Sequence, residues 1–514
     1  MSSVIVVGSG AAGLAAALAA QEEGAEVTLL EAEATIGGTT ALSSGVAWLP
    51  NSHLSAVAGG GDNPGLVRTY LSHLDMGEGD TGVLDRFLAE APRVALWLER
   101  VTPLRWATVP LPDCYCDRPG ANRGGGRSLE PRPLSLPPAG PAARVRPTPP
   151  WRPPATLTEL LTGELTRELV ERRELTGVLT SGQALVAALL GAAVRAGVTV
   201  RTSARATRLT GKGVEVDGQP LHGRVVLASG GFERDPALVE AHLGRPVRGL
   251  IGAPGARGDG LRMALSAGAA LKNTSQAWWC PTIKASGDAV GGEPLYRMLL
   301  AERGRPGALM VDSLGRRFTN EAQSYHEVGR SLRDLGRRTD GDDRAWLVFD
   351  AVHRRRYPVG PLQPADPDPD WLPRGHTPAE LADLIGVPGD ALTGTVHRFN
   401  LGAEHGLDAV FGRGADEYDR AMGDSQAPDP TLGPLREPPF YALRVYPGVG
   451  GTSGGPRTDA DGRVLRADGN AVPGLYGAGN AVASPFGSAY PGTGGTIGPA
   501  LVLGAQAGRA AAGD

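Results

Sequence analysis

The sequence predicts an α/β fold in which both ends of the chain contribute strands to one parallel sheet. Three observations predict it: a β-branched run near the amino terminus leads directly into closely spaced glycines, an expected strand near the carboxyl terminus leads into another glycine turn, and an apolar helical stretch ends the chain. Continuous apolar runs of this kind are typical of strands buried on both faces of a parallel sheet.

The composition is that of a large globular protein. The chain has 514 residues, 41% of them hydrophobic, and its 51 basic and 55 acidic residues leave a net charge of -4 with the basic residues scattered. We therefore expect more than one domain, no nucleic-acid partner, no membrane span and a cytoplasmic location. The three cysteines, Cys114, Cys116 and Cys280, are expected to be free thiols, and no spacing indicates a metal site.

The first unit is a strand, a glycine turn, a helix and a second strand. Residues 4–7 form the β-branched run, the turn reads GSGAAG at 8–13, and an Ala/Leu-rich helix is expected over 14–23. A strand over 26–30 then ends at Glu31. This order of elements is typical of a Rossmann-like dinucleotide-binding unit.

Each part of that unit has a physical role. Gly8 allows the tight turn, Gly10 lets the backbone approach a pyrophosphate, and Gly13 lets the helix pack on the strand. The amino terminus of the helix faces the phosphates. Glu31 stands where a carboxylate accepts hydrogen bonds from a ribose and disfavours a 2′-phosphate.

Further glycine loops favour FAD over NAD as the dinucleotide. One loop follows at 37–40, a strand over 225–232 ends in glycines, and the run 475–480 enters another glycine turn. The loop 494–498 then opens the final helix, expected over 499–512. The amino terminus of that helix suits the pyrimidine side of a flavin, which becomes anionic on reduction. The residues expected to bind FAD are Gly8, Gly10, Ala11, Ala12, Gly13, Glu31, Ala32, Gly37, Gly38, Thr39, Thr40, Ser44, Gly45, Ala204, Ser229, Gly230, Gly231, Asp259, Gly479, Asn480, Gly495, Thr496 and Ile497.

With these motifs the chain resembles the flavoproteins of the fumarate reductase and 3-ketosteroid dehydrogenase superfamily. Besides the amino-terminal glycines, the resemblance rests on GGTTALSSGVAWLP at 37–50, ASGGF at 228–232, GDG at 258–260, RFTNEAQSY at 317–325 and the segment 439–498. It implies an FAD-dependent oxidoreductase.

The fumarate reductase branch differs at its substrate-binding positions. Where those enzymes carry histidines and an arginine acid, this chain has Gly450-Gly451 and Ser488-Ala489-Tyr490. The resemblance therefore argues against fumarate as the substrate. Histidine is also absent from Thr39-Thr40, where covalently flavinylated relatives attach the cofactor, so we expect non-covalent FAD.

The 3-ketosteroid 1-dehydrogenase branch is matched more closely. Its Tyr-Pro-Gly-x-Gly motif corresponds to residues 490–494, and its tyrosine after Asn-Glu-Ala corresponds to Tyr325. The resemblance implies that Tyr325 accepts the proton beside a ketone, and that Tyr490 and the Gly494 amide hold the carbonyl oxygen. The family's helper tyrosine corresponds either to Tyr115 or to Cys114.

Two points of chemistry stay open at this stage. A tyrosine base needs help because its ordinary pKa is near 10, and the adjacent His326 has a better pKa for the role. If the segment is extended, Tyr325 and His326 cannot both face the flavin.

The sequence thus predicts desaturation of a cyclic ketone, steroid-like or smaller, with FAD as the cofactor and an unidentified electron acceptor. The alternatives are enone reduction by the same atoms and a flavin-binding scaffold without turnover. The expected organisation is a split Rossmann-like FAD-binding domain, residues 1–288 and 447–514, with an inserted α+β capping domain over 289–446. The Pro-rich segment 131–154 is expected to be a surface excursion with no fold of its own.

Overall fold

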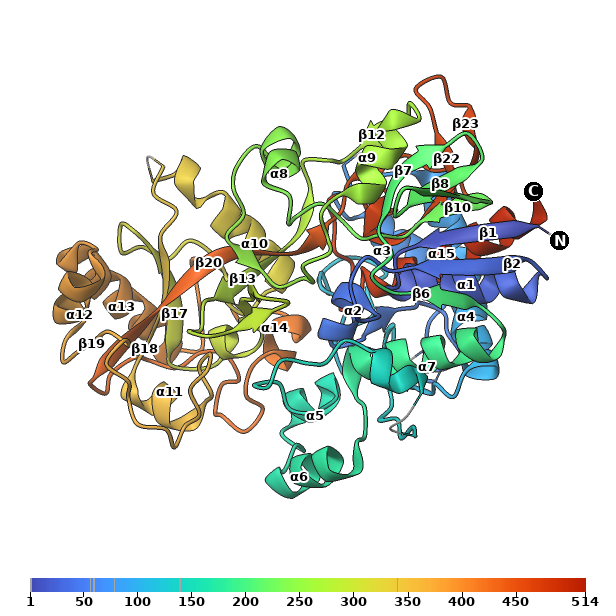
Figure 1. The fold of residues 1–514 in the computed structure, drawn as a ribbon. Coiled ribbons are helices and arrows are strands. Elements are labelled where there is room, and N and C mark those ends of the chain that lie inside the picture. The colour runs from blue at the N-terminus through green and yellow to red at the C-terminus, as the bar shows by residue number, and fades with distance from the viewer. Residues whose placement is uncertain (1, 56, 59–60, 78, 138–139, 340) are drawn as a thin grey trace.

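The computed structural model describes residues 2–514 apart from 56, 59–60, 78, 138–139 and 340. The fold is mixed α/β, and it contains two large sheets that lie on opposite sides of the molecule (Figure 1). The predicted α/β class and parallel sheet are confirmed.

The first sheet combines strands from both ends of the chain. All neighbouring strands pair in parallel except β22 and β23, which are antiparallel. β2 has the predicted bounds. The strand order is β22 (Arg463–Leu465), β23 (Ala471–Gly477), β10 (Arg224–Leu227), β1 (Ser3–Val7), β2 (Glu26–Leu30) and β6 (Thr199–Arg201).

Both faces of β1 are covered, as its continuous apolar sequence predicts. Val4 and Val6 join the core that contains helices α1 (Ala11–Glu22), α7 (Ser181–Arg195) and α15 (Ile497–Gly513). Ile5 and Val7 join a second core on the opposite face. That core is closed by the antiparallel strands β7 (Ala206–Thr210), β8 (Gly213–Val216) and β9 (Gln219–His222).

Helices α1 and α15 pack closely because small residues line their contact. A Cβ atom on Gly504 would lie 2.5 Å from the carbonyl oxygen of Ala12, and one on Gly508 would lie 2.2 Å from that of Ala16. The hydroxyl of Ser2 donates to the carbonyl of Ala512 at 2.9 Å. The two chain ends are therefore joined in one structural unit (Figure 1).

The second sheet is built around the 13-residue strand β20, and all of its pairs except β11–β20 are antiparallel. β13 lies before the boundary predicted at residue 288, yet it pairs with β20 in this sheet. The main order is β16 (Arg297–Met298), β13 (Ala277–Ile283), β20 (Phe440–Thr452), β18 (Ala345–Phe349) and β17 (Ala308–Asp312), with β11 (Gly249–Leu250) and β19 (Arg374–Gly375) also pairing with β20.

Helices cover both faces of this second sheet. α10 (Tyr325–Arg333) packs Val328 and Leu332 on one face. α12 (Pro378–Ile385) and α13 (Gly389–Glu404) cover the other. α10 is the element that begins with the predicted proton acceptor, Tyr325.

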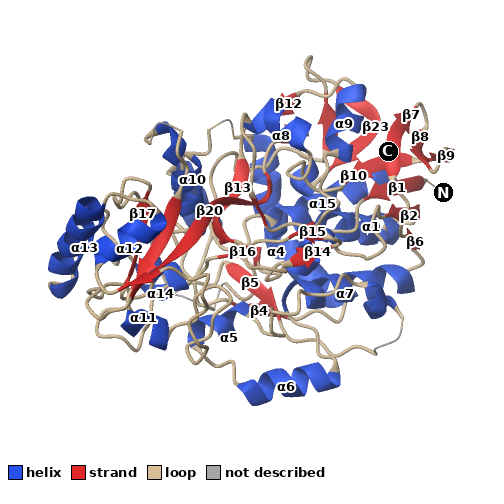
Figure 2. Ribbon diagram, turned by 60° about the vertical axis from the view of Figure 1, so that its left-hand side comes forward, coloured by secondary structure: helices blue, strands red, loops and turns tan. Residues whose placement is uncertain are grey.

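Other helices and strands join and surround the two sheets (Figure 2). They are α2 (Gly38–Leu42), α3 (Pro64–Ser72), α4 (Thr81–Val101), α5 (Leu157–Thr162), α6 (Arg167–Thr176), α8 (Pro236–Leu243), α9 (Asp259–Ser266), α11 (Ala351–Arg356), α14 (Glu417–Ala421), β3 (Ala47–Trp48), β4 (Trp106–Thr108), β5 (Ser128–Pro131), β12 (Leu271–Lys272), β14 (Ala289–Val290), β15 (Glu293–Pro294) and β21 (Gly455–Pro456).

The described part of the Pro-rich segment 131–154 is mostly irregular and at least partly exposed, but hydrogen bonds join it to the rest of the fold. Residues 138–139 lie outside the described part, but the Ile36 amide donates to the Arg144 carbonyl at 2.8 Å and the Arg146 amide donates to the Ile36 carbonyl at 2.9 Å. Val145 and Arg146 are buried. The segment lacks periodicity because distant residues, rather than local ones, supply its contacts.

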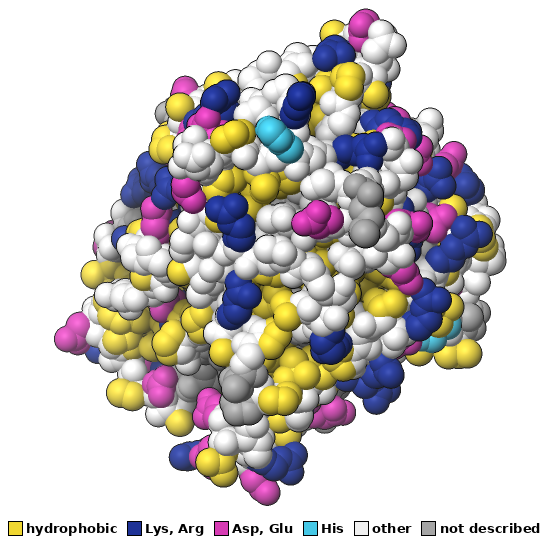
Figure 3. All heavy atoms as spheres, turned by 45° about the vertical axis from the view of Figure 1, so that its right-hand side comes forward, with side chains coloured by type: hydrophobic (Ala, Val, Ile, Leu, Met, Phe, Trp, Pro, Cys, Tyr) yellow, Lys and Arg dark blue, Asp and Glu magenta, His cyan; other side chains and the backbone are white. Residues whose placement is uncertain are grey.

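Acidic and basic side chains alternate over the face shown in Figure 3, with apolar side chains between them. Among the described residues, no helix has both the length and the hydrophobicity needed to cross a membrane.

Candidate active site

The glycine turn after β1 forms an open cradle. Gly8 has a φ of +106°, and a Cβ atom on Gly13 would lie 1.8 Å from the Gly8 carbonyl oxygen, so both positions require glycine. A Cβ atom on Gly10 would meet only the Thr40 hydroxyl, at 3.5 Å. The backbone at Gly10 is thus accessible to a ligand, as the sequence predicts for pyrophosphate.

A first cavity of about 100 Å³ lies over this cradle. Glu31 lines it, and its carboxylate accepts hydrogen bonds from the amides of Ser9 at 3.2 Å and Glu33 at 2.9 Å. The predicted FAD-binding residues that line this cavity are Gly8, Gly10, Glu31, Ala32, Gly38, Thr39, Thr40, Ala204, Ser229, Gly230, Gly231, Asp259 and Asn480.

Arg146 also lines the first cavity, and the sequence reasoning missed it. Its Nε and one terminal nitrogen are buried without hydrogen-bond partners among the described residues. The nearest carboxylate oxygen, on Glu33, is 4.0 Å away. Burial lowers the pKa of Arg146. A buried guanidinium with free donors facing a nucleotide cavity suits a phosphate group.

A second cavity of about 430 Å³ continues from the first one, and Gly10, Thr39, Thr40, Gly230 and Asn480 line both. The other predicted residues that line it are Ala11, Ala12, Ser44, Gly479, Thr496, Ile497, Tyr325, Tyr490 and Gly494. Gly13, Gly37, Gly45, Gly495 and Tyr115 line neither cavity. Of these, Gly13 and Gly45 lie in tight backbone contacts that leave no space for a side chain.

The three groups that the sequence assigns to the chemistry meet in the second cavity. The Tyr325 hydroxyl donates to the Tyr490 hydroxyl at 2.5 Å, and the Gly494 amide donates to the same oxygen at 3.2 Å. Because Tyr490 accepts two hydrogen bonds, its own hydrogen is available to a third group. A ketone oxygen in the cavity could accept it.

The turn that carries Tyr490 is fixed by three distant segments. The Cys114 amide donates to the Pro491 carbonyl at 3.0 Å, the Ser128 hydroxyl donates to the Thr493 carbonyl at 2.8 Å, and the Trp48 amide donates to the Gly494 carbonyl at 3.0 Å. Trp278 packs edge-on against the Tyr490 ring at 5.5 Å. Its indole N–H donates to Asn480 at 3.0 Å. These contacts hold the hydroxyl of Tyr490 in one place.

Burial controls the protonation of both tyrosines. It raises the pKa of Tyr325 well above 10, and the neighbouring Tyr490 adds to the effect. Burial also raises the pKa of Tyr490 to about 12. Both phenols are therefore neutral hydrogen-bond donors at pH 7, and the phenolate of Tyr325 is a minor form.

His326 lies behind Tyr490 and does not line the second cavity. Its ring stacks on the Tyr490 ring at 5.7 Å, and Nε2 lies 3.1 Å from the Ser488 carbonyl, so Nε2 carries the proton. Burial lowers the pKa of His326 to about 4. The segment begins a helix at Tyr325 and not a strand, and successive residues of a helix point about 100° apart, so the two side chains face different surroundings.

Both candidates for the helper position lie near the reacting tyrosines. The Tyr115 hydroxyl donates to Glu327 at 2.7 Å. Cys114 is buried in one cluster with Tyr490 and Tyr418, and Tyr115 and Tyr325 pack against that cluster. Tyr418, on α14, lies close enough to contribute to the raised pKa of Tyr325. No motif marks Tyr418 in the sequence, since it is brought to the site only by the tertiary fold.

All three cysteines are free and buried. Within the described ranges, no cluster of three or more His, Cys, Asp or Glu side chains could hold a metal ion.

Comparison with known proteins identifies related sequences over nearly the whole chain. The profile of the FAD binding domain family matches residues 3–497. A 4-oxocyclohexanecarboxylate 2-dehydrogenase from Sinomonas cyclohexanicum is 37% identical over 537 aligned positions, which cover 99% of this chain and 93% of that protein. A 3-oxosteroid 1-dehydrogenase from Mycobacterium tuberculosis is 36% identical and covers 98% of this chain and 96% of its own length.

Solved structures show the same relationship. The 3-ketosteroid Δ1-dehydrogenase from Sterolibacterium denitrificans, in complex with 1,4-androstadiene-3,17-dione, superposes with a TM-score of 0.90 at 32% identity and covers all of both chains. A flavocytochrome c3 fumarate reductase has a TM-score of 0.66 at 22% identity, covers 99% of this chain and 78% of its own, and shares the fold.

Proposed function

This chain belongs to the FAD binding domain family, and on that premise we propose that it desaturates a cyclic ketone between the carbons α and β to the carbonyl. It is an FAD-dependent dehydrogenase acting on CH–CH groups, as are the dehydrogenases that it resembles along its whole length. The observation that carries the proposal is the convergence of Tyr325, Tyr490 and the Gly494 amide at 2.5 and 3.2 Å.

The residues present fit FAD. The open backbone at Gly10 and the partnerless donors of Arg146 suit the pyrophosphate, while Glu31 suits the adenosine ribose. The amino terminus of α15 and the Asn480 side chain line the adjoining cavity and suit the flavin ring. When bound, FAD supplies the acceptor for the hydride that leaves the β-carbon.

We further propose the domain organisation that this binding requires. Residues 1–288 and 447–514 would form a split Rossmann-like FAD-binding domain, and residues 289–446 would form a capping domain over the substrate. Supporting this division, residues from both ends of the chain line the first cavity, whereas Tyr325, which lines the second cavity, comes from the intervening segment.

In the proposed reaction the minor phenolate form of Tyr325 accepts the proton from the α-carbon and becomes the neutral phenol. Tyr490 and the Gly494 amide hold the carbonyl oxygen, where negative charge develops as the proton leaves. The 2.5 Å contact between the two hydroxyls also lets Tyr490 stabilise charge on Tyr325. The Tyr490 hydrogen can stabilise the Tyr325 phenolate before proton transfer and the enolate oxygen after it, so that charge is compensated at both stages.

Cys114 and Tyr418 complete the surroundings of Tyr325 in this proposal. The Cys114 thiol is buried in one cluster with Tyr490, and Tyr325 packs against it, while the Tyr115 hydroxyl donates to Glu327. Tyr418 supplies a second phenol close to Tyr325. We assign Tyr115 a positioning role, because its hydrogen bond to Glu327 ties the 114–116 segment to α10.

Anaerobic reduction of the flavin by a panel of cyclic ketones tests the proposal. A saturated cyclic ketone should bleach the yellow holoenzyme and leave the corresponding enone in stoichiometric amount. A matched panel of enones, added to the dithionite-reduced enzyme, tests the reverse reaction. If no ketone bleaches the flavin and no enone reoxidises it, the desaturase proposal fails and a flavin-binding scaffold is the better description.

A further inference from the structure

The second cavity has a largely apolar wall with one cationic side chain. Among the described residues that line this cavity, Arg152 is the one charged side chain. Its neighbours in the lining include Trp151, Leu157, Leu160 and Tyr296. A cation among such side chains is costly unless an anion compensates it.

No carboxylate among the described residues compensates Arg152. Its guanidinium donates to the Leu42 carbonyl, and within the described part of the chain it has no acidic partner and no further hydrogen bond. Two buried arginines elsewhere have acidic partners, since Arg127 meets Asp113 at 2.6 Å and Arg173 meets Glu159 at 2.6 Å, whereas the half-buried Arg152 has none among the described residues. Arg152 therefore keeps most of its donors free, and they form a planar fork that suits a bidentate carboxylate.

The surrounding contacts hold Arg152 at the cavity wall. Its backbone amide donates to the Pro149 carbonyl at 3.0 Å, which forms a turn between prolines. The adjacent Trp151 ring is covered by the Arg297 guanidinium at 4.4 Å, and the charge of Arg297 is neutralised by Asp288 at 2.6 Å. Burial lowers the pKa of Arg152 to about 10, so the group is still cationic at pH 7.

We propose that Arg152 binds the carboxylate of a cyclic keto acid whose ketone lies at Tyr490 and Gly494. The inference rests on the proposed function and names its substrate class. Arg152 does not line the first cavity, where Arg146 faces the cradle that suits the phosphates of FAD. The anion that Arg152 meets is therefore on the substrate side, and the substrate of one relative, a 4-oxocyclohexanecarboxylate 2-dehydrogenase, has this chemistry.

The test compares a charged and a neutral substrate of the same ring. Wild-type holoenzyme, Arg152→Met and Arg152→Lys are assayed with 4-oxocyclohexanecarboxylate and with its methyl ester. Removing a charge-assisted hydrogen bond should lower kcat/KM for the acid by about 10- to 100-fold in Arg152→Met. The ester should change by less than about threefold, since it makes no ion pair. Arg152→Lys should retain part of the preference for the acid.

Arg144→Met is the matched control. Arg144 lies in the same segment and donates to the Val200 carbonyl, but it does not line the second cavity. The substitution removes one positive charge without changing the cavity lining, so the ratio of kcat/KM for the acid to kcat/KM for the ester should stay at the wild-type value. A ratio that falls equally in both variants would overturn the inference in favour of a general effect of charge.

A binding measurement separates this inference from the proposed function. Titration of the flavin spectrum with 4-hydroxybenzoate, and with phenol as the neutral probe, needs no turnover. Tighter binding of the acid to wild type, weakened 10- to 100-fold in Arg152→Met, supports the inference even if no ketone is oxidised. A different outcome is that neutral ketones, including 4-androstene-3,17-dione, reduce the flavin while Arg152→Met leaves the ratio of acid to neutral affinity and the ratio of acid to ester kcat/KM unchanged. In that case the desaturase proposal stands and the Arg152 inference fails.

Discussion

At the scale of single residues, the site depends on burial. Tyr325 and Tyr490 are ordinary phenols whose environment raises both pKa values and places their oxygens 2.5 Å apart. His326, next in the chain, would be the better base in water, but burial lowers its pKa to about 4 and its ring packs behind Tyr490. Because Tyr325 lines the second cavity and His326 does not, Tyr325 is the better placed of the two to accept a proton from a ligand there.

Tyr325→Phe should slow flavin reduction by about 10² to 10⁴, because it removes the proposed proton acceptor. Binding of an unreactive ligand should be largely kept, since the ring remains. Single-turnover reduction by the best ketone of the panel measures the first effect, and spectral titration measures the second. Reduction at close to the wild-type rate would exclude Tyr325 as the acceptor and direct attention to Tyr418.

Tyr490→Phe should slow the same step by about 10² to 10³, with some weakening of ketone binding. It deletes one donor to the developing enolate oxygen, while the Gly494 amide remains. The two variants are thus distinguished by binding as well as by rate. A Tyr490→Phe enzyme with unchanged rate and affinity would contradict the proposed oxyanion site.

The rate of flavin reduction should rise with pH between 7 and 9. Burial raises the pKa of Tyr325 well above 10, so the phenol is neutral in this range and the phenolate fraction grows about tenfold per pH unit. Stopped-flow reduction across this range measures the slope, with stability checked at each pH. Tyr325→Phe is the control and should have a flat profile, and a flat profile in wild type would argue against the phenolate.

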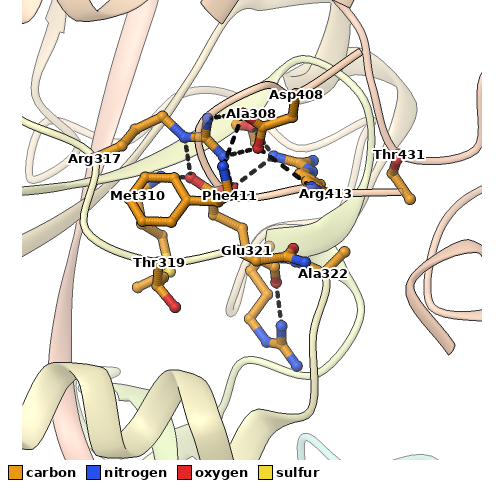
Figure 4. Close-up of polar contacts among 12 residues, drawn as sticks. Ala308, Met310, Arg317, Thr319, Glu321, Ala322, Asp408, Phe411, Arg413 and Thr431 are labelled. Carbon is orange, nitrogen blue, oxygen red and sulfur yellow. Dashed lines mark hydrogen bonds and ion pairs between the residues drawn. The ribbon is translucent and has the colours of Figure 1, made fainter. Parts of the chain in front are cut away.

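At the scale of elements, a buried ionic network holds the loop that leads into α10. Glu321 accepts hydrogen bonds from Arg317 at 2.6 Å and from Arg413 at 3.2 Å, and Arg317 also meets Asp408 at 2.8 Å (Figure 4). Arg303 donates to the carbonyls of Glu321 and Gln323 in the same loop. The conformation of this loop decides where Tyr325 begins the helix.

Glu321→Gln should lower the free energy of unfolding by about 3 kcal/mol, because it leaves the fully buried Arg413 without its counter-charge. Although burial opposes it, Arg317 holds the pKa of Glu321 below its ordinary value. The stabilisation is therefore present above the unfolded-state pKa and is lost as the pH falls through the folded-state pKa.

Chemical denaturation of the wild-type and Glu321→Gln holoenzymes at pH 7 and at acidic pH measures the difference in their free energies of unfolding. This difference should be smaller at acidic pH. Glu171→Gln is the control, because Glu171 pairs with Arg167 on the surface and its loss should leave stability unchanged. Equal stability of Glu321→Gln and wild type at pH 7 would show that the network does not stabilise the loop.

At the scale of the whole molecule, the chain closes on itself around the cofactor site. Strands near residues 5, 225 and 475 lie side by side, and the last helix packs on the first. The first cavity therefore exists only when both chain ends are folded together. Binding of FAD across this junction should stabilise the fold as a whole.

The purified protein should be yellow, and acid precipitation should release its flavin into the supernatant. Thr39 and Thr40 offer no histidine for a covalent bond, and the Thr40 hydroxyl instead accepts a hydrogen bond from the Ala11 amide at 3.0 Å. FAD added at 100 times its Kd should raise the free energy of unfolding by about 2.7 kcal/mol. Flavin retained in the acid pellet would show a covalent link.

The sequence by itself determined the α/β class, the parallel sheet and the glycine cradle, and it identified Tyr325 and Tyr490 as candidate catalytic residues. These depend on local patterns: a buried strand needs a continuous apolar run, and a tight turn at Gly8 needs glycine. Only the tertiary structure decided that Arg146, Arg152 and Tyr418 line or adjoin the two cavities, and that the Tyr115 hydroxyl turns to Glu327. Those placements come from contacts between segments far apart in the chain, which no local spacing encodes.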